Sequence, residues 1–293
     1  MLTLRAFSPD PLDPEYTISS RFSRKRSLLV LTIGGAGVHG YTARPRGKRW
    51  EIIPGEKVEG PYLTTSLLEQ GRTMARTNHL VISFTPANLL CELEMGHLPD
   101  DNSLQKALLS NPKSVLRNRY EQDRRYQIVP SGDKKKFISF SVTSREAVAV
   151  EKVIKEVGMN IARMQIGLAN MTNLAIRRLE SARKDGTKKL ILVGDQSVIL
   201  GMAVRDGVWE DPFSFISRTS EGSSSDVESI IEYLESLAGE VDEPGVEFHL
   251  LHSRTCWWVE PVQKWFQKYA SRFQLKRIEE QFPFVELQEA LEG

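Results

Sequence analysis

The sequence has few groupings of residues of the kind that perform chemistry. Its five histidines form no His-Glu-x-x-His motif, and His249 and His252 flank the end of a predicted strand, so no zinc site is predicted. No Gly-x-Ser-x-Gly sequence is present, which leaves a serine hydrolase without support. Cys91 and Cys256 lie far apart in apolar surroundings and are expected to be buried, reduced thiols.

Two turns with glycine directly follow apolar runs, and these are the places where backbone could approach a ligand closely. Each run has the continuous apolar character of a central strand. The first run, 28–33, is followed by Gly34 and Gly35, and the second, 190–193, by Gly194, Asp195 and Gln196.

The same series of elements follows each of these runs. It consists of the apolar strand, a glycine turn, a second strand, a hairpin, a third strand, a helix and another strand. The predicted ranges are 28–33, 38–44, 50–53, 66–76 and 79–84 in the first copy, and 190–195, 197–204, 209–218, 227–237 and 246–251 in the second. Such a repeat predicts a duplicated ribonuclease H-like unit, the architecture of actin, hexokinase and chaperone ATPases, with a cleft between the halves.

Other elements lie between and after the two copies. An alternating segment at 89–98, a helix that ends at Leu109 and a strand at 137–142 are predicted to form a small inserted unit. A helix at 144–157 has one apolar face and is expected to end at Gly158. Helices at 168–182 and 259–272 and a strand at 275–278 complete the prediction.

Three stretches make the chain resemble the PilM and GspL proteins, the cytoplasmic actin-like scaffolds of type IV pilus and type II secretion machines. They are the Leu98-Pro99-Asp100 start of the insertion, residues 157–166 before a long helix, and residues 192–197 before Gly207-Val208-Trp209. The resemblance covers about residues 28–285 and implies an α/β actin-like fold. The predicted division is a leader arm at 1–26, a first half at 27–165 with an insertion at about 86–142, and a second half at 166–293.

The resemblance also implies where a nucleotide would bind. The family's first phosphate loop corresponds to Gly34 and Gly35, and its second to Asp195 and Gln196. Thr32 stands where the family has its first carboxylate, and a hydroxyl neither holds Mg²⁺ through water nor offsets its charge. Asp195 has two interpretations, a ligand of metal-bound water or an Asx-type cap at a turn.

The adenosine motif differs most from the family. Where the family has Gly-Gly, the chain has His252-Ser253-Arg254-Thr255 and then Cys256-Trp257-Trp258, which puts bulk and charge where backbone should approach a purine. We therefore expect a degenerate nucleotide site and a pseudo-ATPase without a cofactor, with residual binding of ATP and Mg²⁺ left open. One of the adjacent tryptophans is expected to point away from the core.

The function that the resemblance implies is a non-catalytic scaffold of an inner-membrane assembly platform. Its partner would be the cytoplasmic tail of a bitopic membrane protein, with the assembly ATPase and a second copy of the chain as further partners. The tail would lie in a groove lined by strands at 81–85, 89–93 and 137–142. The alternative is a nucleotide-binding actin-like ATPase or switch.

Charge and hydropathy limit the partners. The chain has 39 basic and 38 acidic side chains, which gives no overall drive toward nucleic acid. Its first apolar run, 28–38, is shorter than the roughly 20 residues that cross a bilayer. The resemblance implies a cytoplasmic protein, peripheral at the inner membrane. Basic stretches at 44–49, 117–125 and 134–136 are either solvated loops or a surface for anionic lipid.

Overall fold

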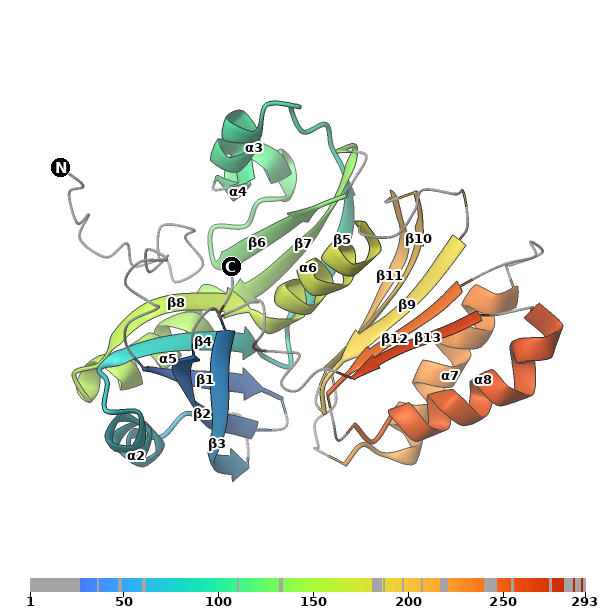
Figure 1. Ribbon diagram of the computed structural model, residues 1–293. Coiled ribbons are helices and arrows are strands. Elements are labelled where there is room, and N and C mark those ends of the chain that lie inside the picture. Colours follow the sequence, from blue (N-terminus) through green and yellow to red (C-terminus); the bar gives the residue numbers. More distant parts are fainter. Residues whose placement is uncertain are drawn as a thin grey trace.

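The computed structural model has two halves that share one topology (Figure 1). The residues it describes are 27–35, 37–46, 49–59, 62–109, 111–131, 134–180, 186, 188–196, 198–206, 208–216, 221–239, 247–253, 256–273, 276–281, 287 and 291. The predicted leader arm at 1–26 lies outside these residues. None of the helices that can be described is long and apolar enough to span a membrane.

The first half is a five-stranded mixed sheet with the strand order β3-β2-β1-β4-β8. Strands β1, β2 and β3 are antiparallel neighbours, whereas β4 and β8 run parallel to β1. The elements are β1 (Leu28–Gly34), β2 (Gly37–Arg46), β3 (Arg49–Glu59), α2 (Thr65–Ala75), β4 (His79–Thr85), α5 (Ser144–Glu156) and β8 (Asn160–Ile166).

The second half repeats this arrangement with the order β11-β10-β9-β12-β13 and the same strand directions. Its elements are β9 (Lys188–Gly194), β10 (Val198–Arg205), β11 (Val208–Ile216), α7 (Ser224–Gly239), β12 (Glu247–His252), α8 (Val259–Phe273) and β13 (Lys276–Gln281). The predicted duplication of a ribonuclease H-like unit is confirmed.

An inserted unit lies between β4 and α5. It contains a three-stranded antiparallel sheet with the order β5-β7-β6. Its elements are β5 (Leu90–Met95), α3 (Asn102–Leu109), α4 (Pro112–Leu116), a short 3₁₀ helix (Arg117–Arg119), β6 (Arg124–Pro130) and β7 (Lys136–Thr143).

Strand β6 is absent from the sequence-based prediction because it begins with two arginines. Arg125 is buried, and its Nη1 lies 3.2 Å from the carboxylate of Glu151, which is also buried. Arg124 donates to the hydroxyl and the carbonyl of Ser141 on β7. These partners satisfy charges that the sequence pattern suggests are solvated.

Local sequence signals fix the ends of α5. Thr143 is the N-cap: its hydroxyl oxygen accepts a hydrogen bond from the backbone N–H of Glu146, and the hydroxyl donates to the Glu146 carboxylate. After the last turn, Gly158 adopts φ +67°, a conformation that glycine takes without a Cβ penalty. The predicted helix end at Gly158 is confirmed.

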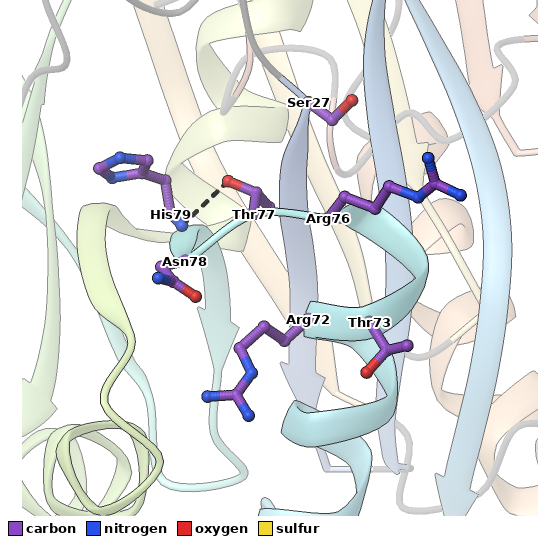
Figure 2. Close-up of a pocket in the computed structure, with 7 residues that line it drawn as sticks. All are labelled: Ser27, Arg72, Thr73, Arg76, Thr77, Asn78 and His79. Carbon is purple, nitrogen blue, oxygen red and sulfur yellow. Dashed lines mark hydrogen bonds between the residues drawn. The ribbon is translucent and has the colours of Figure 1, made fainter.

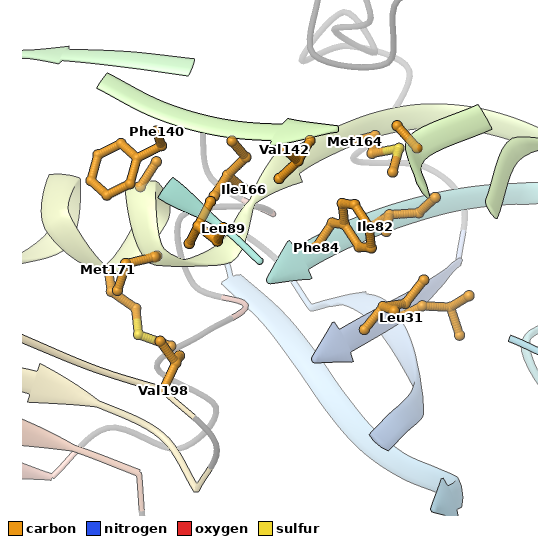
Figure 3. Packing of buried hydrophobic residues seen from close by; sticks show 14 of the residues in the cluster. Leu31, Ile82, Phe84, Leu89, Phe140, Val142, Met164, Ile166, Met171 and Val198 are labelled. Atoms are coloured by element: carbon orange, nitrogen blue, oxygen red, sulfur yellow. The ribbon is translucent and has the colours of Figure 1, made fainter. Parts of the chain in front are cut away.

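Helix α6 (Gly167–Glu180) joins all three sheets. It packs against β4 and β8 of the first half, β6 of the insertion and β9 and β10 of the second half. Nearly every residue of its first nine is buried, and Figure 3 shows Met171 reaching Val198 of β10 within one continuous apolar cluster. The two halves therefore share a core.

Residues close to the C-terminal end pack on the first half, although the predicted division counts them with the second. Leu287 and Leu291 are buried against Leu28 and Val30 of β1, and Val81 of β4 belongs to the same cluster. The chain thus crosses between the halves once at α6 and again after β13.

We expect Met171→Ala to lower the free energy of unfolding by about 2 to 5 kcal/mol, because it opens a cavity where the sheets meet. Chemical denaturation measures this value. Val148→Ala on the exposed surface of α5 is the matched control and should change stability by less than about 0.5 kcal/mol. Equal effects of the two substitutions would contradict the central role of α6.

Candidate functional site

A row of uncharged polar residues crosses the carboxyl end of the first sheet. The register of the parallel strands places Thr32 of β1 opposite Ser83 of β4, and Ser83 opposite Gln165 of β8. On the other side, Thr32 faces His39 of β2. Carboxylates are the usual protein ligands of Mg²⁺, and the three parallel strands present hydroxyls and an amide in this row.

The first predicted loop lies next to this row. Gly34 ends β1 and pairs with Gly37, and Gly35 occupies the turn between β1 and β2. The structure therefore places both glycines of the predicted phosphate loop in or beside the turn between β1 and β2. The nearest ionisable side chain across the strands is His39, whose pKa is lowered by burial and by the charge of Lys57.

The start of α6 brings further polar groups to the same edge. A Cβ added to Gly167 would lie 2.6 Å from the Ser83 hydroxyl and 2.4 Å from the Thr85 hydroxyl, so only glycine allows this approach. Among the described residues, Gln165 Oε1 and Asn170 Nδ2 are buried without a hydrogen-bond partner. Such groups cost free energy unless a ligand or water pairs with them.

Sequence reasoning missed Gln165 and Asn170. The available signal is the Gln-Ile-Gly sequence at 165–167, in which a polar residue and a glycine directly follow a buried strand. From the sequence this segment indicates only a connection between the halves, because nothing in the pattern shows that Ser83 and Thr85 pack against Gly167.

The second loop is stabilised by its own aspartate. Asp195 Oδ1 accepts a hydrogen bond of 2.8 Å from the backbone N–H of Val198, and the Asp195 N–H donates to the Val198 carbonyl at 3.0 Å. This is the Asx-type turn named as one of the two interpretations of Asp195. The turn joins β9 to β10 and occupies one oxygen of the carboxylate.

Two tryptophans from the predicted adenosine motif bind the same loop. Trp258 Nε1 donates to the Asp195 carbonyl and Trp257 Nε1 donates to the Gln196 carbonyl, both at 2.7 Å. Trp258 is fully buried, and a Cβ on Gly194 would lie 3.2 Å from its ring. The structure thus brings the second loop together with the segment that begins at His252, and indole rings fill the space beside the loop.

Trp257 is held by contacts on several sides, although the sequence predicts that one of the two adjacent tryptophans points away from the core. It is half-buried, Phe215 packs edge-on against it, and the backbone of Gly222 lies so close that a Cβ there would clash. With its N–H also bonded, it does not project from the surface as an anchor for a partner. Arg254 and Thr255 of the same segment lie outside the described residues.

The described residues contain no group of three or more His, Cys, Asp or Glu that could hold a metal ion. His249 and His252 are three residues apart on β12, so their side chains point to opposite faces of the sheet. Burial raises the pKa of the Cys91 thiol to about 12, which makes it an unreactive neutral thiol.

The predicted tail groove is wrong for two of its three strands. Strand β4 is paired on both sides by β1 and β8, and β7 is paired on both sides by β5 and β6. The side chains of residues 81–85 and 137–142 are buried. Of the three predicted strands, β5 alone is an edge strand with exposed side chains, and its neighbour across the edge is β11 of the second half.

Comparison with known proteins shows the fold. No protein-family profile matches the sequence. No curated protein matches it either. Solved structures do match, beginning with a protein of unknown function and actin-like ATPase fold from Bacteroides thetaiotaomicron, with a TM-score of 0.55 and 12% identity over 94% of this chain and 98% of that chain.

Two further matches come from secretion and pilus systems. The PilM-PilN type IV pilus biogenesis complex matches with a TM-score of 0.51 and 10% identity over 89% of this chain and 94% of that chain. The cytoplasmic domain of EpsL, from the type II secretion system of Vibrio cholerae, matches with a TM-score of 0.47 and 13% identity over 91% of this chain and 95% of that chain. At these identities the likeness concerns the fold alone, and the predicted α/β actin-like fold is confirmed.

We expect Asp195→Asn to leave stability within about 0.5 kcal/mol of the native value, because the amide oxygen still accepts from Val198 N–H. Asp195→Ala removes that acceptor and should cost about 1 kcal/mol. Thermal or urea unfolding of both variants measures the difference. If Asn destabilises as much as Ala, the negative charge itself is required and the turn does not account for Asp195.

Proposed function

We propose that this chain is a non-catalytic scaffold that binds the cytoplasmic tail of a membrane protein in a pilus-like or secretion-like inner-membrane assembly platform. The chain would act in the cytoplasm, peripheral at that membrane. An assembly ATPase and a second copy of the chain are further partners of such a platform. The fold likeness to a chain of the PilM-PilN type IV pilus biogenesis complex supports this class of function.

The observation that carries the proposal is the concentration of exposed apolar side chains on the inserted unit. Of six large apolar residues that are exposed among the described ones, three lie there: Leu90 and Met95 on β5 and Leu104 on α3, at 44 to 73% exposure. Leu90 and Met95 are five residues apart on β5 and therefore point to opposite faces of the inserted sheet. Exposed apolar groups concentrated on one unit favour a protein partner. We call Leu90, Met95 and Leu104, which lie on more than one face of this unit, the insertion surface.

The mode of binding follows from the position of β5. Cys91, which points to the face opposite Leu90, is hydrogen-bonded to Ser214 of β11, so β11 already lies beside this strand. A tail would therefore gain its affinity from apolar side chains packed on the insertion surface rather than from a complete new strand ladder.

The absence of catalysis is part of the same proposal. Thr32 leaves the first strand without a carboxylate, Asp195 accepts within its own turn, and Trp257 and Trp258 occupy the place beside the second loop. A competent site for nucleotide hydrolysis needs charge that binds the metal and space for the base. Both are reduced in this chain.

The unpartnered Gln165 and Asn170 favour a second candidate function, a nucleotide-binding switch without hydrolysis. Gln165 belongs to the row that includes Thr32 at the carboxyl end of the first sheet, and Asn170 lies in the first turn of α6, which begins just after it. A polar ligand at this edge would pair with the free acceptor of Gln165.

Binding of a tail peptide tests the scaffold. The probes are peptides with the cytoplasmic tail sequences of membrane proteins encoded beside this one. We expect the double substitution Met95→Ser and Leu104→Ser to weaken peptide binding by roughly tenfold or more, because it removes two apolar anchors. Met74→Ser with Val148→Ser removes similarly exposed apolar groups from α2 and α5 and should leave affinity unchanged. Titration calorimetry separates the two results. Failure of every such tail to bind the native chain removes the proposal.

Thermal melting with and without Mg·ATP tests the second candidate. The scaffold predicts no shift, whereas a ligand present at 100 times its Kd stabilises by about 2.7 kcal/mol. An upward shift that Asp195→Asn abolishes would favour the nucleotide-dependent switch.

A further inference from the structure

A polar hollow lies at the amino end of the first sheet, opposite to the edge that carries Thr32 and Gln165. Its volume is about 730 Å³. The described residues that line it come from the start of β1, the last turn of α2 and the turn into β4. They are Ser27, Arg72, Thr73, Arg76, Thr77, Asn78 and His79 (Figure 2).

The lining has positive charge and no carboxylate among these residues. Arg72 and Arg76 are one helical turn apart, and within the described part of the chain neither has an acidic group at ion-pair distance. Arg72 donates through Nη1 to the Val157 carbonyl at 2.9 Å, which anchors its guanidinium. Arg76 is exposed and keeps its guanidinium available.

A purely structural role accounts for only part of this charge. Arginines in the last turn of a helix offset a partial charge of about −0.5 at the carbonyl end. Arg72 fulfils that role, since its contact is a carbonyl at the end of α5, the neighbouring helix. The positive charge of Arg76 is not paired within the described contacts and can therefore bind a ligand.

The hydrogen-bonding groups determine which ligand would fit. Ligand sites typically measure about 300 to 1,000 Å³ and are mostly apolar, whereas the side chains that line this hollow are hydroxyls, an amide, an imidazole and guanidiniums. Figure 2 shows Arg72 and Arg76 extending to opposite sides of the end of α2. A ligand that contacts both sides therefore needs an anionic group and additional polar groups.

We infer that this hollow binds a phosphate group carried on a polyhydroxylated body, such as glycerol phosphate. The phosphate pairs with the Arg76 guanidinium, whose planar fork suits oxyanions. The hydroxyls of the ligand bond Ser27, Thr73, Thr77 or Asn78. The same chemistry is found in a soluble phosphate ester and in the headgroup of phosphatidylglycerol. The inference is independent of the proposed scaffold function.

The experiment uses the full chain and two probes. Titration calorimetry with sn-glycerol 3-phosphate tests the soluble source. Sedimentation with phosphatidylglycerol vesicles, against vesicles of phosphatidylcholine alone, tests the lipid source. We expect at least one probe to bind the native chain, and we expect Arg76→Asn to weaken that binding roughly tenfold or more, as for loss of a charge-assisted bond.

The variants are chosen so that folding is retained. Arg76 adopts φ +49°, a left-handed conformation that asparagine tolerates at the end of a helix. Arg72→Gln is the second variant, and Arg145→Gln, which removes an exposed arginine on α5, is the matched control with native binding expected. Binding of neither probe, or equal binding by the native chain and Arg76→Asn, would overturn the inference. If only the phosphatidylglycerol vesicles bind, the ligand is the lipid. If both probes bind, the hollow recognises the glycerol phosphate group that they share.

Discussion

The burial of α6 is the constraint on which the arrangement of the three sheets depends. The first nine residues of α6 are buried on nearly all sides, and such a helix segment can be stable only where protein surrounds it. Here the first sheet, the inserted sheet and the second sheet provide that surrounding, and Met171 and Leu168 belong to a cluster that extends from β1 to β12. Moving one half relative to the other would expose part of this helix. The halves are therefore joined by packing as well as by the chain.

The same close packing produces the polar features at the edge of the first sheet. Because β8 leads into α6 at Gly167, the hydroxyls of Ser83 and Thr85 come within van der Waals contact of the helix backbone. Gln127 of the inserted sheet accepts a hydrogen bond of 2.8 Å from the Ile166 N–H at this junction. Gln165 and Asn170 are placed by the needs of the core, and their unmet hydrogen bonds are what mark the edge as a place for a polar ligand.

Much of this architecture could be predicted from local patterns. Apolar runs predicted both central strands, and Gly158 predicted the end of α5, because these signals act over a few residues. Strand β6 was missed, since the partners of Arg125 and Arg124 are remote in sequence. For the site, the composition of the loops was predictable. The bonds from Trp257 and Trp258 to the second loop were not, because they join positions more than 60 residues apart.

The hydrogen bonds of the two indoles show how the second loop differs physically from the first, when both are compared with an actin-like nucleotide site. From the sequence, Thr32 and the bulky segment at 252–258 are independent changes in opposite halves. In the structure, Trp258 is buried against Gly194 and bonded to the Asp195 carbonyl, so the tryptophans are part of the second half's core. Restoring a carboxylate at residue 32 would return charge to the first loop, yet the indoles would still fill the space beside the second. Relative to the nucleotide site that the resemblance implies, the first half therefore lacks charge and the second half has added bulk, which are different physical means.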